Sequence, residues 1–270
     1  MNGIMTYTPQ TYARLLKLLK DREYRFAGYN ETPSIKEAPK IVYLRHDIDY
    51  SPGWALAFAE INADHGVSGT FFFQTRSPIY NLLAYPTLAI VGKIAALGQH
   101  VGLHYTIHED NASDEATLIA HIAEEYRRAR EYLPKMAPVF SWHNPSLAPH
   151  ILASGMDMTV PGMTNTYSRH FFEEVKYYAD SNLRHSVQDF ENIIDAGHPW
   201  LQLLFHPFQW MAEGQDMQQV LANTWIQVIR ERELEFKNNH IYRELFPVGM
   251  PEEWLKLLAS DFGRYRKEKE

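Results

Sequence analysis

Two aspartates near the end of the first apolar run have a spacing that could support catalysis. Asp47 and Asp49 are separated by one residue, so on an extended chain their carboxylates share one face. Such a pair could act as a metal ligand and a general base, because a bound cation offsets the repulsion between the two charges. The alternative is a turn after a strand, where aspartate is common because it hydrogen-bonds the local backbone. The pair alone does not decide between these interpretations.

Two histidines four positions apart, His104 and His108, could supply imidazole ligands. On one continuous strand their Cα atoms would lie about 13 Å apart, which is too far for shared ligation. On a helical turn, residues at this spacing have Cβ atoms about 5–6 Å apart, within reach of one zinc ion. Together with Asp49 they would provide two nitrogens and one oxygen. The chain has no cysteine, so His, Asp and Glu are its strong metal ligands.

A further histidine, His206, follows the apolar run 200–205 and would emerge where a buried strand meets the site. This position favours a general acid, although a strand-capping histidine fixed by Pro207 has the same pattern. His143 has the same ambiguity, and we assign it to the wall of the pocket.

The elements that must position these residues are short β-prone runs alternating with helical stretches, an order typical of parallel βαβ units. The predicted strands are 41–45, 69–74, 100–104, 138–142, 157–160, 175–178 and 200–205. The predicted helices are 12–24, 53–65, 86–97, 114–132, 147–154, 187–196, 216–237 and 252–259. Polar clusters follow several of the strands, and in parallel barrels this edge carries the active site.

Length and composition limit the class of protein. The 270 residues, 45% of them hydrophobic, fit one α/β domain covering 1–270. A net charge of −7 gives no electrostatic reason to bind nucleic acid. The N-terminal residues lack the pattern of a secretory signal, and no apolar run is long enough for a transmembrane helix. We therefore expect a cytoplasmic location and no transmembrane segment.

From about Ile41 to Pro207 the sequence resembles the polysaccharide deacetylase family, the NodB-homology group of carbohydrate esterases. The most specific segment, GLHYTIH at 102–108, is similar to the family's two-histidine metal motif. RHDID at 45–49 is similar to its paired-aspartate motif, and LLFH at 203–206 to the late motif that carries the catalytic histidine. YADS at 178–181 is similar to the fourth motif, from which we carry over only Asp180.

The resemblance implies a distorted parallel (β/α) barrel, seven-stranded, with extra terminal helices. It also implies one divalent metal, Zn²⁺, held by Asp49, His104 and His108, with Asp47 as base and His206 as acid. The substrate-binding residues expected around them are Arg45, Tyr105, Trp142, His143, Asn144, Asp180 and Arg184.

This sequence departs from the family pattern at two motifs. Ile48 separates the paired aspartates, and Tyr50 stands where the family has glycine. The segment SWHNP at 141–145 occupies the place of the family's arginine motif, so Arg45 or Arg184 would orient Asp47 instead.

The expected activity is metal-dependent removal of an N-acetyl group from a sugar or glycan precursor, with an O-acetyl group as the less favoured substrate. One alternative is a metal-dependent hydrolase of a non-sugar amide or cyclic ureide. Another is a non-catalytic carbohydrate-binding protein on the same scaffold.

Overall fold

The core of the protein is a curled, mostly parallel sheet in a computed structural model, whose described residues are 7–31, 40–107, 114–145 and 157–261. Its strands are β1 (Arg25–Phe26), β2 (Ile41–Ile48), β3 (Thr70–Phe73), β4 (His100–Thr106), β5 (Val139–His143), β6 (Thr164–Asn165), β7 (Lys176–Ala179) and β8 (Trp200–Phe205). Seven of them follow the order β6-β5-β4-β3-β2-β8-β7, and β1 pairs with the start of β2. This is the distorted (β/α) barrel that the sequence predicts.

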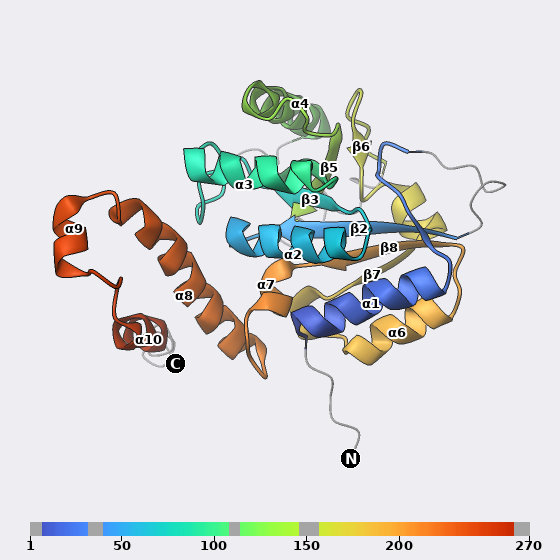
Figure 1. Cartoon of the computed structure of the whole chain (residues 1–270). Helices are drawn as coiled ribbons and strands as arrows, with labels where there is room; N and C mark the ends of the chain where they lie inside the picture. The colour runs from blue at the N-terminus through green and yellow to red at the C-terminus, as the bar shows by residue number, and fades with distance from the viewer. Residues whose placement is uncertain (1–6, 32–39, 108–113, 146–156, 262–270) are drawn as a thin grey trace, which may run out of the picture.

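Helices cover the outside of this sheet (Figure 1). Those around the sheet are α1 (Pro9–Asp21), α2 (Pro52–Asp64), α3 (Tyr85–Ala96), α4 (Glu115–Tyr132) and α6 (Val187–Asp195), and the helices that follow β8 are α7 (Pro207–Met211), α8 (Met217–Phe236), α9 (His240–Leu245) and α10 (Glu252–Asp261). Two short helical turns, η3 (His170–Glu174) and η4 (Ser181–Leu183), flank β7. No helix among the described ranges is long and apolar enough to span a membrane.

Most predicted elements agree with the structure to within a few residues. The strand predicted at 157–160 is wrong, because residues 158–160 are irregular and the short β6 forms at Thr164–Asn165 instead. The helix predicted at 147–154 lies outside the described residues. The sequence patterns did not predict α7 and α9, which are short helices of five and six residues.

Strand β2 is buried along its whole length because β3 and β8 pair with it on either side. Its side chains alternate between two environments. His46 faces the outer helices, where Tyr12 and Asn62 lie within 3.4 and 3.2 Å of its Nε2 atom. Arg45 and Asp47 face the opposite side and bond each other. The alternation therefore brings Asp47 and Asp49 to one side of the sheet, as the sequence predicts.

The C-terminal helices α8, α9 and α10 lie on one side of the barrel (Figure 1). Glu231 on α8 accepts hydrogen bonds from the Ser51 hydroxyl and the Gly53 amide, so α8 is joined to the start of α2. The buried carboxylate of Glu233 on α8 accepts hydrogen bonds from the Tyr242 hydroxyl and the Met250 amide, both at 2.6 Å, and so joins α9 and the segment after it to α8.

Candidate metal and catalytic site

Three potential metal ligands meet at the carboxyl ends of β2, β4 and β5. Asp49 Oδ1 lies 3.2 Å from His104 Nε2 and 3.1 Å from His143 Nδ1, and the two ring nitrogens are 3.1 Å apart. His104 is buried, with 2% of its side chain exposed, while Asp49 and His143 are 13% and 17% exposed. The group therefore opens to solvent on one side.

The distances within this group fit a cation. A tetrahedral zinc ion with bonds of about 2.0–2.1 Å holds neighbouring donor atoms about 3.3–3.4 Å apart, close to the separations found here. Hydrogen bonds alone do not account for the cluster. Only one proton fits between two ring nitrogens 3.1 Å apart, and the carboxylate supplies none. Asp49, His104 and His143 thus have the donor atoms that a divalent metal requires.

A turn after β5 places His143 in this group. Asn144 has a left-handed backbone, with φ of 49°, a conformation that asparagine tolerates better than most residues. Its side-chain amide lies 2.9 Å from His143 Nε2, which leaves Nδ1 directed at Asp49. The sequence assigned His143 only to the pocket wall, whereas the structure places it among the potential ligands. His108, the predicted second histidine ligand, lies outside the described residues.

The other ring nitrogen of His104 is held by a residue that the sequence analysis missed. His104 Nδ1 lies 2.7 Å from the hydroxyl of Ser141, which is buried on the adjacent strand β5. Ser141 also donates to Asp47 Oδ1 at 3.4 Å. The period of two along a strand offered a signal, because Ser141 must share a face with His143.

Asp47 forms a buried ion pair with Arg45. Arg45 donates through Nε and a terminal nitrogen to the two oxygens of Asp47, at 2.9 and 2.7 Å, and also to the Tyr167 hydroxyl at 3.1 Å. Burial raises the pKa of Asp47, but the adjacent Arg45 charge outweighs it, so the pKa is lowered overall. Of the two arginines proposed to orient Asp47, Arg45 makes the contact, while Arg184 is exposed on the loop after β7.

His206 faces the three potential ligands from the end of β8. Its Nε2 atom lies 3.9 Å from Asp49 Oδ2, and its Nδ1 atom donates to Asp180 Oδ1 at 2.5 Å. Burial lowers the pKa of His206, but the carboxylate of Asp180 more than offsets this and raises it to about 9. His206 is therefore an imidazolium at neutral pH in the metal-free protein.

Asp180 is a buried partner of His206, although the sequence analysis placed it among the substrate-binding residues. Besides Nδ1 of His206, its oxygens accept the backbone amide of His206 at 2.7 Å and the indole nitrogen of Trp210 at 2.8 Å. Asp180 has no exposed surface, so its role in this structure is to hold His206.

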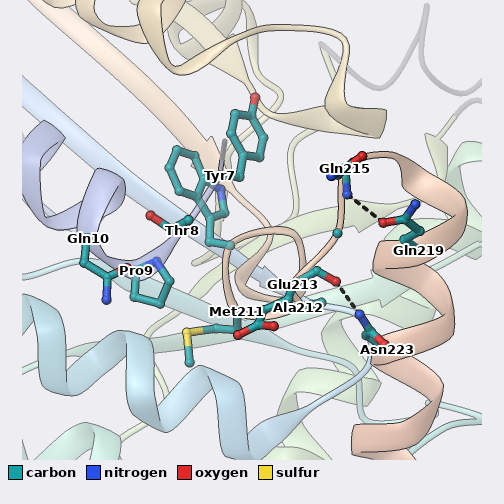
Figure 2. A pocket seen from close by; sticks show the side chains of 12 residues that line it. Tyr7, Thr8, Pro9, Gln10, Met211, Ala212, Glu213, Gln215, Gln219 and Asn223 are labelled. Atoms are coloured by element: carbon teal, nitrogen blue, oxygen red, sulfur yellow. Dashed lines mark hydrogen bonds between the residues drawn. The ribbon is translucent and has the colours of Figure 1, made fainter. Parts of the chain in front are cut away.

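A separate pocket of about 590 Å³ lies between the start of α1 and the segment joining α7 to α8 (Figure 2). Tyr7 stacks on Trp210 in its wall, with ring centroids 4.2 Å apart. Several of its polar groups bond within the wall, as when the Gln215 amide donates to the Gln219 side chain at 3.0 Å. Its lining includes none of Asp49, His104, His143 and His206.

Two aromatic residues expected to bind substrate are part of the core instead. Tyr105 has no exposed surface and Trp142 is 2% exposed, and their rings pack edge to face with centroids 5.7 Å apart. Both alternate with site residues along their strands, so they point to the opposite face of the sheet. Stacking of either ring on a sugar does not fit this burial.

No protein-family model and no curated protein sequence matches this chain. Among solved structures, it is similar to the catalytic domain of a peptidoglycan N-acetylglucosamine deacetylase from Eubacterium rectale, with 15% identity over 76% of this chain and 90% of that chain, at a TM-score of 0.46. A chitin deacetylase from Colletotrichum lindemuthianum is 16% identical over 69% of this chain and 82% of that chain, at a TM-score of 0.43.

A CE4 family pseudoenzyme from Bacillus anthracis is 14% identical over 72% of this chain, at a TM-score of 0.40. The chain spans 62% of the length of that protein.

Proposed function

We propose that this protein is a metal-dependent deacetylase that hydrolyses the N-acetyl group of a sugar or glycan precursor. The observation that carries the proposal is the convergence of Asp49, His104 and His143 opposite His206, whose pKa Asp180 raises. These three side chains would hold one divalent cation, Zn²⁺ in our proposal. His108 stays a sequence prediction for this metal site.

A cation held there would polarise the acetyl carbonyl and lower the pKa of a water molecule beside it. Asp47 is suited to receive the proton of the attacking water. Its Oδ2 atom lies 3.8 Å from His104 Nε2, next to the potential ligands, and its lowered pKa keeps it ionised at neutral pH. Arg45 fixes its orientation by bonding both of its oxygens.

His206 is suited to the opposite proton transfer. Because Asp180 occupies Nδ1, the proton on Nε2 points toward Asp49 and is available to the leaving group. As water adds to the carbonyl carbon and the C–N bond breaks, Asp47 gains a proton and His206 gives one to the departing nitrogen. The products are acetate and a free amine.

The sugar portion of the substrate is inferred from the motifs that resemble the polysaccharide deacetylase family. With Tyr105 and Trp142 buried, substrate recognition falls to residues that reach solvent. Asn144 and Arg184 are the exposed members of the predicted set, and they lie on the loops after β5 and β7.

Acetate release tests this function. Protein purified without chelators and reconstituted with Zn²⁺ is assayed against N-acetylated sugars, O-acetylated sugars, acyclic N-acetyl amides and a cyclic ureide. We expect acetate from the N-acetylated sugars, and a His206→Ala variant that retains zinc should be defective. Turnover of the cyclic ureide alone would refute the deacetylase proposal, as would glycan binding by the zinc-loaded protein without turnover.

A further inference from the structure

We propose that Ser141 is a positioning residue that fixes the proton of His104 on Nδ1 and keeps Nε2 free to bind the cation. The hydroxyl of Ser141 lies between His104 Nδ1, at 2.7 Å, and Asp47 Oδ1, at 3.4 Å. The inference deepens the proposed function, because it rests on a cation held by Asp49, His104 and His143.

The direction of these hydrogen bonds follows from counting protons. Both oxygens of Asp47 already accept from Arg45, so Asp47 acts as an acceptor and the single proton of Ser141 points to Asp47 Oδ1. The hydroxyl oxygen of Ser141 can then accept a hydrogen bond from a proton on His104 Nδ1. A neutral imidazole carries one N–H, so His104 Nε2 is unprotonated where it meets Asp49 and His143.

The reverse arrangement would spoil the metal site. If Ser141 donated to His104 Nδ1, the ring proton would lie on Nε2, between His104 and the oxygen of Asp49, and would block ligation. An imidazole that binds a metal is neutral and carries one N–H, so the ring of His104 must adopt one of its two tautomers. The carboxylate of Asp47, behind Ser141, selects the tautomer that a metal needs.

The strand pairing holds Ser141 in this position. It lies opposite His104 in the register of β4 and β5 and has no exposed surface. The residue two positions along, His143, supplies a potential ligand, so one strand both contributes to the metal group and orients another member of it.

The first test measures zinc affinity by competition with a chelator for wild type, Ser141→Ala and Ser141→Thr. Loss of a group that orients a metal-bound histidine typically weakens metal affinity about 10–100-fold, and we expect this in Ser141→Ala, with recovery in Ser141→Thr, which restores the hydroxyl. Thr166→Val is the matched control, because Thr166 Oγ1 is also buried and has no partner among the described residues. Its zinc affinity should equal that of wild type.

The second test reads the tautomer directly in metal-free protein by ¹⁵N NMR of labelled histidine, with His104 assigned by its loss in His104→Gln. The proton should be on Nδ1 in wild type and Thr166→Val, and should move to Nε2 in Ser141→Ala, where Asp49 can accept it. A proton on Nε2 in wild type overturns the inference, as does unchanged zinc affinity in Ser141→Ala.

Neither measurement requires turnover, so the role of Ser141 and the deacetylase function can be refuted independently of each other. A wild-type protein that shows both Ser141 effects but releases no acetate refutes the deacetylase and leaves the role of Ser141 intact. Acetate release by wild type, with zinc affinity unchanged in Ser141→Ala, refutes only the role of Ser141.

Discussion

Replacing Asp180 with Asn should convert His206 from an imidazolium into a neutral imidazole while leaving its ring in place. All three groups bound to Asp180 are donors in the wild type, namely the backbone amide and Nδ1 of His206 and the indole of Trp210. An asparagine oxygen can accept from the amide and the indole while its NH₂ donates to His206 Nδ1. His206 would then keep a proton on Nε2 without carrying a charge.

The size of the effect follows from the pKa of His206, which is about 9 in the structure against 6.5 for an ordinary histidine. At pH 7 nearly all of His206 is protonated at the first value, and only about a quarter at the second. In the Asp180→Asn variant no carboxylate at position 180 opposes the effect of burial, which lowers the pKa of His206 further. If that pKa falls to about 5, the charged fraction drops roughly 100-fold, so amide hydrolysis at pH 7 should fall at least about fourfold and up to about 100-fold.

Two assays check this reasoning. An NMR titration of metal-free Asp180→Asn should give a His206 pKa below 6.5. Hydrolysis of an amide should suffer more than that of an aryl acetate, whose leaving group needs little protonation, and His206→Ala should show the same bias. Equal losses on both substrates, or a His206 pKa that stays near 9, would refute the role given to the Asp180–His206 pair.

The same pair predicts a pH dependence of stability. Because folding raises the pKa of His206, its contribution to stability is fully present below about pH 6.5 and is lost as the pH rises through about 9. Asp180→Asn should remove this part of the pH dependence in the metal-free protein, as measured by urea unfolding between pH 6 and 9.

The remaining predictions concern the metal group and the buried ion pair. His104→Ala and His143→Ala should each sharply reduce the zinc content measured after purification without chelators. Full zinc occupancy in both variants would refute the proposed ligands. His108→Ala, measured in parallel, tests the ligand that the sequence predicted. Asp47→Asn should retain zinc but lose about 10²–10⁴ in rate, the usual contribution of a positioned base, whereas loss of zinc, with activity restored by added metal, would make Asp47 a ligand. Arg45→Met should destabilise the fold by about 3–5 kcal/mol in urea unfolding, because it leaves the Asp47 charge buried without its partner, and a change under about 1 kcal/mol would contradict this.

The sequence by itself determined the architecture and several residues of the site. Alternation of apolar strand patterns with helical stretches predicts the parallel sheet, because each short buried run must be followed by a helix that returns the chain to the same edge. The period of two along β2 placed Asp47 and Asp49 on one face, and the run that ends at Phe205 placed His206 at the edge of the sheet. These are local properties of the chain, so a local pattern could reveal them.

Only the tertiary structure decided how these residues are partnered. Strand register brings Ser141 beside His104, and a left-handed turn at Asn144 directs His143 to Asp49. Asp180 reaches His206 because β7 pairs with β8, the strand that follows it in the chain. The charge of His206 and the burial of Tyr105 depend on these contacts between distant segments, because a pKa and an exposed surface are set by what surrounds a side chain in space rather than by its neighbours in sequence.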